Sequence, residues 1–316
     1  MVFTFIVFHL IFAALMSPFI LFWGPFESLK VIAVGSVYTS RHPQYVQYFL
    51  SEDRITNIMH TYDNRIPSSI KVDRVSVVTN ADEGITIEDI EGRNYYGLPY
   101  KGKVMLISDP KRVKIALTSQ IGVAGERLTD MIRNSEAIAG INAGGFYDPD
   151  GKGNGSFPDG ITIHNGEIVH NSADGKAQDM IAFDAQGNLI LETLTASQLE
   201  EKDIQEGISF YPNLIKNGKT LITGDGGWGT APRTGIGQTA DGTVIFVVID
   251  GRQPLWSNGA ALSDLMKVFI DYGAVTAANL DGGSSSEMIY DGKILNKLWN
   301  VFGERYMPTA FVVMPK

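Results

Sequence analysis

The chain has 316 residues, of which 44% are hydrophobic and 19% are charged, close to the average of globular proteins. Its net charge of −9 argues against nucleic acid as a partner, because a phosphate backbone requires clustered Lys and Arg side chains. The absence of cysteine excludes disulfides, thiol catalysis and zinc–thiolate sites. Length alone allows one large domain or two ordinary ones.

The first 26 residues are almost wholly apolar, and the first charged residue is Glu27. The run from Val2 to Phe26 is long enough for a transmembrane helix, which needs roughly 20 apolar residues. A cleaved signal peptide and a buried soluble helix are the alternatives, but the segment lacks a basic start and a clear A-x-A cleavage site. We therefore expect residues 1–26 to be a single-pass cell-membrane anchor, with the main domain on the extracytoplasmic side.

Residues 27–100 are interpreted as a juxtamembrane stem and linker. Residues 46–59 have the pattern of a short amphipathic helix, and residues 72–78 resemble a strand. The main domain is placed at residues 101–316, because strand signals become regular there, beginning at residues 104–117 with a turn at Asp109-Pro110.

Strands outnumber helices in this domain. Asn165-Gly166 between two short apolar segments predicts a β-hairpin, and residues 180–183 and 188–192 predict a second strand pair. The apolar run at residues 243–249 indicates a strand buried on both faces. Helices are expected at residues 125–134 and 262–272. Because strands and helices do not alternate regularly, we predict an α+β fold with a curved mixed or antiparallel sheet core and flanking helices, preceded by the transmembrane helix.

The first polar cluster begins at Asn142, where an apolar segment ends in a glycine-rich turn. Backbone N–H groups in such a turn can hold an anion or a sugar hydroxyl, although a purely structural turn has the same pattern. Asp148, Asp150 and Asp159 partly follow the spacing of a calcium loop, but Lys152 stands where an oxygen ligand is needed. No cofactor is required by the sequence, and a structural calcium ion is left open.

Two further clusters contain Arg233 and Asp250. Arg233 lies between a proline and a threonine in a glycine-rich stretch, where its planar guanidinium is well suited to an oxyanion. Asp250 ends the buried strand and is followed by Gly251 and Arg252, a common position both for a catalytic carboxylate and for a simple turn. The ring of Trp256 could stack on a sugar or pack internally.

The fourth cluster is centred on Asp281. Strand alternation brings Asn279 and Asp281 to one face, and residues 282–286 supply backbone and hydroxyl donors beside the carboxylate. A carboxylate next to such donors is what hydrolysis needs, whereas a capped turn is the structural alternative. The motifs of serine hydrolases, nucleotide-binding loops and zinc proteases are absent. His164 and His170 flank the predicted hairpin turn, so a histidine-based serine triad is poorly supported.

These clusters together resemble the phosphodiester glycosidase family, which includes bacterial exopolysaccharide-related proteins. The resemblance covers residues 104–315 and is carried by residues 141–160, 232–238, 250–252 and 279–283, by Asn296 and by Glu304-Arg305. It implies an enzyme that hydrolyses the anomeric C–O bond of a sugar-1-phosphodiester in a cell-surface or extracellular glycan. The products are a free sugar and a phosphomonoester.

The resemblance also implies roles for individual residues. Asp281 is expected to be the base or the nucleophile, with Asp250 or Glu304 as its partner. The predicted substrate-binding residues are Arg233, Arg252, Asn142, Asn279, Gly282, Gly283, Thr234 and Arg305. Arg233, together with Arg252, would neutralise the phosphate, the asparagines would hold sugar hydroxyls, and the glycine N–H groups would stabilise developing charge.

Two alternatives stay open at this point. One is a non-catalytic protein that binds phosphoglycan or assists exopolysaccharide assembly, and the other is a metal-dependent phosphodiesterase that cleaves the P–O bond. The natural sugar, the alcohol on the other side of the phosphate and the stereochemical outcome do not follow from the sequence.

Overall fold

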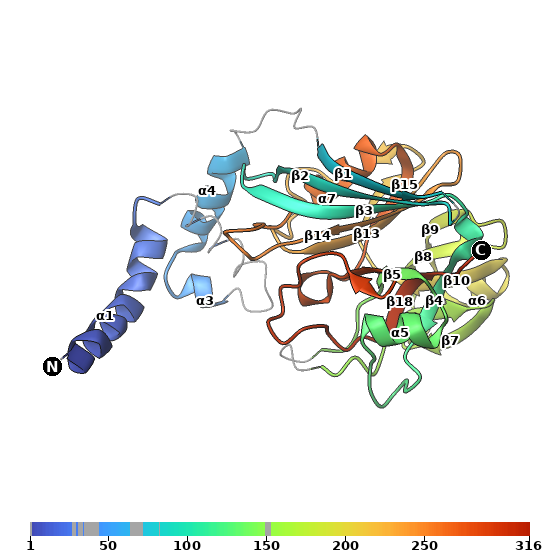
Figure 1. Ribbon diagram of the computed structural model, residues 1–316, viewed down its shortest axis with the longest axis horizontal. Coiled ribbons are helices and arrows are strands. Elements are labelled where there is room, and N and C mark those ends of the chain that lie inside the picture. The colour runs from blue at the N-terminus through green and yellow to red at the C-terminus, as the bar shows by residue number, and fades with distance from the viewer. Residues whose placement is uncertain are drawn as a thin grey trace.

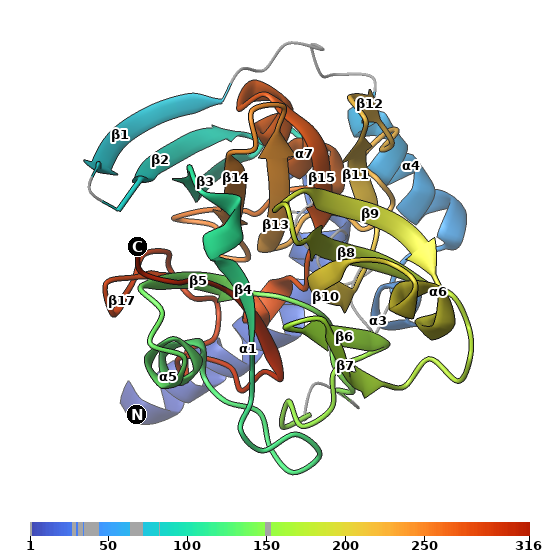
Figure 2. The same ribbon diagram turned by 90° about the vertical axis from the view of Figure 1, so that its right-hand side faces the viewer.

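The computed structural model describes residues 2–26, 30, 34, 44–63, 72–81, 83–148 and 153–316. The described strands form three sheets, and the named strands within them pair antiparallel (Figures 1 and 2). The predicted α+β class with a sheet core is confirmed.

The largest sheet has eight strands and includes the strands that carry most of the predicted site. Their order is β1 (Asp73–Asn80), β2 (Ile85–Arg93), β3 (Pro99–Ile107), β14 (Val244–Ile249), β13 (Arg233–Thr239), β15 (Ala274–Asn279), β11 (Asn213–Lys216) and β12 (Lys219–Thr220). All six residues of β14 are buried, as predicted for a central strand. Helix α7 (Leu262–Asp271) covers one face of this sheet.

Glycine allows the close approach of α7. A Cβ atom on Gly235 or Gly237 of β13 would lie 2.9 Å or 2.7 Å from the ring of Phe269. The two glycines therefore let this buried aromatic ring rest directly on the strand that begins with Arg233.

The other two sheets have five strands each. One has the order β7 (Glu167–Asn171), β6 (Ile161–His164), β10 (Ile204–Ser209), β8 (Gln178–Asp184) and β9 (Leu189–Leu194). The other has the order β17 (Lys293–Ile294), β16 (Met288–Tyr290), β5 (Ala139–Asn142), β18 (Thr309–Val313) and β4 (Val113–Leu117). Residues of all three sheets share one apolar core, which includes Phe246, Ile181 and Phe311. This shared core holds the carboxyl ends of β5, β10 and β15 in fixed positions relative to one another.

Local sequence signals account for several of these elements. Strands β6 and β7 form the predicted hairpin, with Asn165 and Gly166 at φ values of 51° and 82°. Strands β8 and β9 form the second predicted pair. The helix expected at residues 125–134 is α5 (Leu128–Asn134), which starts later because Glu126 forms a bridge with Met307. Short helical segments occur at Pro110–Arg112, Ala196–Glu200 (α6) and Gly283–Ser285.

The region before residue 101 differs from a simple stem. Strands β1 and β2 form one edge of the eight-stranded sheet, so the sheet begins at Asp73, and the boundary predicted at residue 101 falls inside β3. The helix expected at residues 46–59 is two helices, α3 (Gln44–Gln47) and α4 (Glu52–Asp63). Val46, Leu50 and Ile55 are buried together with Phe22 and Val34.

Helix α1 (Val2–Trp23) projects away from the sheets (Figure 1). Among the described residues, no helix combines the length and apolar character needed to cross a bilayer. The transmembrane helix predicted for residues 1–26 is therefore not supported.

Candidate active site

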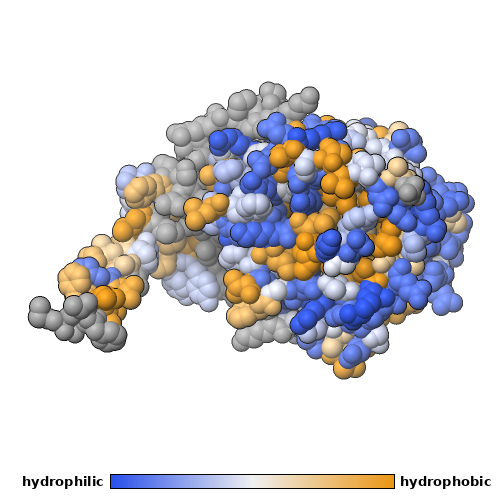
Figure 3. All heavy atoms as spheres, viewed as in Figure 1, coloured by the Kyte–Doolittle hydropathy of each residue, from blue (hydrophilic) through white to orange (hydrophobic). Residues whose placement is uncertain are grey.

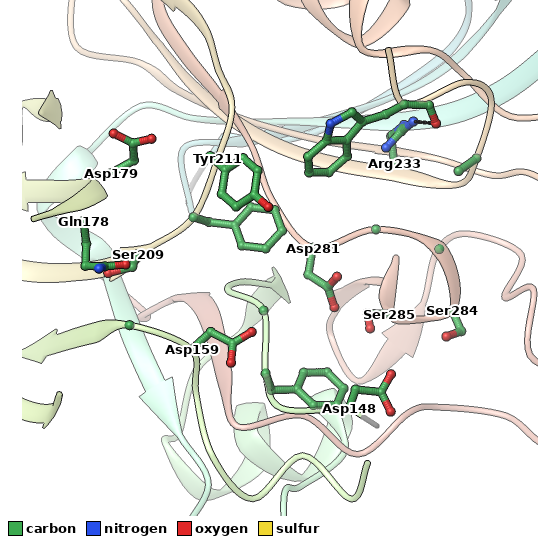
Figure 4. A pocket seen from close by; sticks show the side chains of 18 of the residues that line it. Asp148, Asp159, Gln178, Asp179, Ser209, Tyr211, Arg233, Asp281, Ser284 and Ser285 are labelled. Atoms are coloured by element: carbon green, nitrogen blue, oxygen red, sulfur yellow. Dashed lines mark hydrogen bonds between the residues drawn. The ribbon is translucent and has the colours of Figure 1, made fainter. Parts of the chain in front are cut away.

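A pocket of about 1020 Å³ opens between the sheets (Figure 4). Five stretches of chain supply most of its polar wall: the turn after β5, the start of β8, the start of β13, the loop after β14 and the turn after β15. The predicted residues Asp281, Arg233, Arg252, Arg305, Gly282 and Gly283 all line it.

Asp281 lies at the centre of this pocket in the view of Figure 4. Its backbone is fixed on both sides, because its N–H donates to Ala143 O at 3.0 Å and its C=O accepts from Asn142 Nδ2 at 2.6 Å. Burial raises the pKa of its carboxyl to about 6, although hydrogen bonds from Ser285 and from the Gly282 N–H oppose the shift. Such a group is mostly ionised at neutral pH and still able to exchange a proton.

Arg233 is a buried cation at the start of β13, with 4% of its surface exposed. Its Nε donates to Ala260 O at 3.0 Å, and its Nη2 donates to the carbonyls of Trp228 and Gly229 at 3.0 and 2.7 Å. It forms no ion pair with a carboxylate in the described part of the chain. Burial, together with the positive charge of Arg252, lowers its pKa to about 10.

Arg252 is a second cation facing the pocket, and its backbone has a φ of 58°, in the left-handed region. A non-glycine residue there stores about 1–3 kcal/mol of strain, a feature that clusters at functional sites. Its guanidinium lies against Gly283, where a Cβ atom would be 3.4 Å from Nη1. Burial lowers the pKa of Arg252. Among the described residues, neither guanidinium group has a carboxylate partner, so the two together create a site that an anion would neutralise.

Arg305, in contrast, is already paired. Its Nη2 forms an ion pair with Asp148, its Nη1 donates to Ser284 Oγ at 2.9 Å, and its guanidinium lies 4.9 Å from the ring centre of Phe146. Asp148 also accepts from the Gly153 N–H at 2.6 Å. Arg305 thus links the turn after β15 to the loop that carries Asp148.

The same ion pair bears on the candidate calcium loop. Asp148 is engaged with Arg305, Asp159 lines the pocket, and Asp150 lies outside the described residues. Within the described ranges, no three acidic or histidine side chains are grouped so that they could hold a metal ion.

Aromatic rings line part of the pocket, and the local sequence pattern does not predict this aromatic wall. Tyr211 meets Trp228 edge to face at 5.4 Å and stacks on Phe210 at 5.8 Å. Trp228 lies in the same glycine-rich stretch as Arg233, which was the one available signal for its position. Flat aromatic faces combined with a few polar groups are typical of small-ligand pockets.

Trp256, which the sequence suggested as a sugar platform or a packing residue, does not line this pocket. Its Nε1 donates to Asp250 Oδ2 at 2.7 Å. Asp250 is itself buried and also accepts from Asn296 Nδ2 at 3.2 Å and from the Lys297 N–H at 3.0 Å. Burial raises the pKa of Asp250. Both of its oxygens are thus used to hold two loops together, outside the pocket.

Asn142 and Thr234 are also outside the pocket. The Oδ1 of Asn142 accepts from Thr234 Oγ1 at 2.8 Å and from the Glu287 N–H at 3.1 Å, while its Nδ2 holds the Asp281 carbonyl. Asn279 donates to Tyr211 O at 3.1 Å, and its buried Oδ1 accepts no hydrogen bond from the residues that the structure describes. These groups position the pocket walls rather than face the cavity.

Glu304 does not line the pocket, and it accepts from the Thr129 N–H at 2.9 Å. It interacts with Glu287, whose pKa is raised to about 9 by burial first and by the charge of Glu304 second. The predicted oxyanion donors have other partners as well, because the Gly283 N–H donates to Pro232 O at 2.9 Å and the Gly282 N–H donates to Asp281.

The pocket thus combines a carboxylate, two neighbouring arginines and aromatic rings within an α+β sheet fold. The chain belongs to the phosphodiester glycosidase family, whose model matches residues 135–314. Among curated proteins it is similar to the SPbeta prophage-derived uncharacterized protein YomE of Bacillus subtilis strain 168, with 27% identity over 199 residues. That match covers 60% of this chain and 30% of the relative, so the chain spans less than a third of that protein's length.

Solved structures share the fold. The catalytic domain of zebrafish N-acetylglucosamine-1-phosphodiester alpha-N-acetylglucosaminidase, auto-inhibited by its pro-peptide, has a TM-score of 0.62 at 19% identity, over 81% of this chain and 93% of that one. A hypothetical protein from Synechocystis has a TM-score of 0.60 at 16% identity, over 78% of this chain and 68% of that one.

Proposed function

We propose that this pocket hydrolyses the glycosidic C–O bond of a sugar-1-phosphodiester and releases a free sugar and a phosphomonoester. The observation that carries the proposal is the grouping of Arg233 and Arg252 with Asp281 in one pocket, where neither arginine forms an ion pair with any carboxylate that the structure describes. Membership of the phosphodiester glycosidase family supports the reaction class. The source of the diester in a cell-surface or extracellular glycan, and an extracytoplasmic location, are parts of the same proposal.

The phosphate occupies the arginine end of the pocket. The carbonyl contacts of Arg233 use Nε and Nη2, so Nη1 is left to donate to a phosphate oxygen. Arg252 adds a second positive charge from the loop after β14. Because the pocket is partly closed to water, these charges act on the phosphate more strongly than they would in bulk solvent. They stabilise the negative charge that develops as the leaving oxygen departs.

Asp281 acts as a carboxylate at the anomeric carbon. As a base it removes a proton from water while the water oxygen bonds to C1. The C1–O bond breaks, and its electron pair stays on the phosphate oxygen. As a nucleophile it would instead form a glycosyl ester that water then hydrolyses. A phosphate monoester is a good leaving group, so little acid assistance is needed. In both routes the ionised form of Asp281 is the active one.

The sugar lies between Asp281 and the aromatic wall. Tyr211 and Trp228 offer ring surface, while Asp159 and Gln178 offer polar groups for hydroxyls. These four side chains take the sugar-binding role that the sequence analysis had given to asparagines.

The test incubates the purified full chain with N-acetylglucosamine-1-phospho-methyl ester and identifies the products by phosphorus NMR. Methyl phosphate with free sugar is the expected result, and it should be lost in Asp281→Asn. Asp53→Asn, which changes an exposed aspartate in α4, is the matched control and should keep full activity.

Other products would exclude the proposed reaction. Sugar-1-phosphate would mean that the P–O bond is cleaved. Saturable binding without any product, across diesters of several sugars, would instead favour a phosphoglycan-binding protein.

A further inference from the structure

Two loops beside the pocket expose large apolar side chains to solvent. Leu255 is fully exposed, and Val301 and Phe302 are exposed by 88% and 93%. Trp256 and Trp299 are exposed by 40% and 41%. We call these five residues the apolar rim. Exposed apolar groups gathered on one part of a surface mark interaction sites, whereas single scattered ones do not.

The two loops are held together as one surface. Gln253 Nε2 donates to Lys297 O at 3.0 Å, which joins the loop after β14 to the loop before β18. Asp250 accepts from both Trp256 Nε1 and the Lys297 N–H, at 2.7 and 3.0 Å. Figure 1 shows both loops on the side of the sheets from which α1 projects, and apolar surface is visible there in Figure 3. These hydrogen bonds therefore hold the two loops that carry the apolar side chains in a fixed arrangement.

The character of the rim fits a lipid surface. Lys101 Nζ and Lys297 Nζ lie 4.6 and 5.1 Å from the ring centre of Trp256. Lys297 forms no ion pair with a carboxylate in the part of the chain that the structure describes. Segments that enter the interface of anionic membranes typically combine exposed apolar side chains with nearby tryptophan and lysine. Each Lys near such a surface contributes about 1 kcal/mol to the binding free energy.

The rim adjoins the arginine end of the pocket. Arg252 directly precedes the first loop, and Arg305 follows the second. In Figure 4 Arg233 and Ser284 lie on one side of Asp281, and Gln178 and Asp179 lie on the other. If the arginines hold the phosphate and the sugar lies at Asp281, the other alcohol of the diester would extend away from Asp281 and toward the rim.

We propose that the apolar rim docks on a lipid surface and that the phosphodiester hydrolysed in the pocket is esterified to a lipid alcohol held in that surface. The second half of this inference rests on the proposed function. The two loops that carry the rim also supply Arg252 and Arg305 to the pocket wall, so a lipid alcohol leaving the pocket would meet the rim. Lys297 would face the anionic headgroups, whereas Lys101 forms an ion pair with Glu91. A protein partner is the competing occupant, but the unpaired Lys297 and the adjoining phosphate end favour a lipid surface.

Substrate preference tests the lipid alcohol. N-acetylglucosamine-1-phospho-hexadecyl ester, carried in vesicles of equimolar phosphatidylglycerol and phosphatidylcholine, is compared with the soluble methyl ester. Phe302→Ser and Leu255→Ser should each lower kcat/KM for the vesicle-borne ester about tenfold, corresponding to about 1.4 kcal/mol of lost apolar contact, and leave the methyl ester unchanged. Val123→Ser, which changes an apolar residue 70% exposed in another loop, is the control. Equal effects on the two esters, or none, would overturn the lipid-alcohol assignment.

Docking itself is tested without turnover. Because the chain has no cysteine, Phe302→Cys can be labelled uniquely with a polarity-sensitive nitrobenzoxadiazole dye. Adding the same vesicles should shift the emission to the blue, whereas a label at Glu167→Cys, exposed on β7, should not respond. No shift at position 302, or an equal shift at both positions, would overturn the docking surface. A shift at 302 without hydrolysis of either ester would reject the proposed function and keep the docking surface.

Discussion

The charge of Asp281 links the pocket's geometry to its chemistry, because burial holds the pKa of this carboxyl at about 6. If the ionised form is the active one, kcat/KM for the methyl diester should rise about tenfold per pH unit below that value. It should then level off above about pH 6. The measurement is kcat/KM between about pH 4 and pH 8. A profile that falls with rising pH across this range would assign Asp281 to an acid role.

The same shift predicts a stability effect. A carboxyl whose pKa rises from 3.8 to about 6 on folding makes the folded state less stable as pH increases through that interval. At about 1.4 kcal/mol per unit, the ionised side chain costs about 1–3 kcal/mol above pH 6. Asp281→Asn should therefore raise the free energy of unfolding by this amount at pH 7.5, and the gain should vanish below about pH 4. Urea denaturation at both pH values checks it, and an equal gain at both would contradict the assignment.

Three elements meet at Asn142, which ends β5 and binds Thr234 of β13, the Glu287 N–H and the Asp281 carbonyl. Asn142→Ala would leave these buried groups without a partner, at a cost of about 2–4 kcal/mol of folding free energy. It should also lower kcat, because the turn that carries Asp281 loses its support. Asn188→Ala, in an exposed turn, is the control.

Thermal unfolding and steady-state kinetics distinguish this structural role of Asn142 from a sugar-binding role. A side chain that held substrate directly would raise KM and leave the melting temperature unchanged. The structural role of Asn142 instead predicts that Asn142→Ala lowers both the melting temperature and kcat.

The elements that the sequence predicted are those with local signals. Asn165-Gly166 requires positive φ at both positions, and the uninterrupted apolar run of β14 fits a strand buried on both faces. The run of β14 places Arg252 just beyond a strand end, and the fold brings Arg252 into one pocket with Arg233 and Asp281. The pattern could not show how Asp250 is used, since its position at a strand end is the same whether its oxygens face a cavity or bind two loops.

Tertiary packing explains what the sequence missed. Tyr211 and Trp228 face each other only because β11 and the loop before β13 are neighbours of β15 in space. The sequence marks residues 72–78 as strand-like but does not place β1 in the sheet, because its side chains are mostly exposed and give no sign of a buried face. An edge strand of this kind is identified by its partner strand, which a local pattern does not contain.

The stability of the whole fold depends on the sheet edge formed by β1 and β2. Strand β2 pairs with β3 along its full length, and Ile85 and Ile90 of β2 are each 1% exposed and belong to the two largest cores. A chain starting at Lys101 would lose both side chains, worth about 1.5–3 kcal/mol each, and would leave β3 as an open edge prone to aggregation. Together with the lost ladder, this approaches the 5–15 kcal/mol that stabilises a typical domain.

A chain starting at Val72 should therefore melt cooperatively and elute as a folded species, whereas one starting at Lys101 should aggregate. Thermal melting with size-exclusion chromatography measures both. The Val72 fragment keeps the backbone bond from Val72 N to Asp271 Oδ2, which ties the start of β1 to the end of α7. A cooperative melt of the shorter fragment would mean that β1 and β2 are an addition to a complete sheet. Aggregation of both would mean that the cluster around Val46 and Ile55 is needed to cover Tyr95 and Tyr96, against which Ile58 of α4 packs.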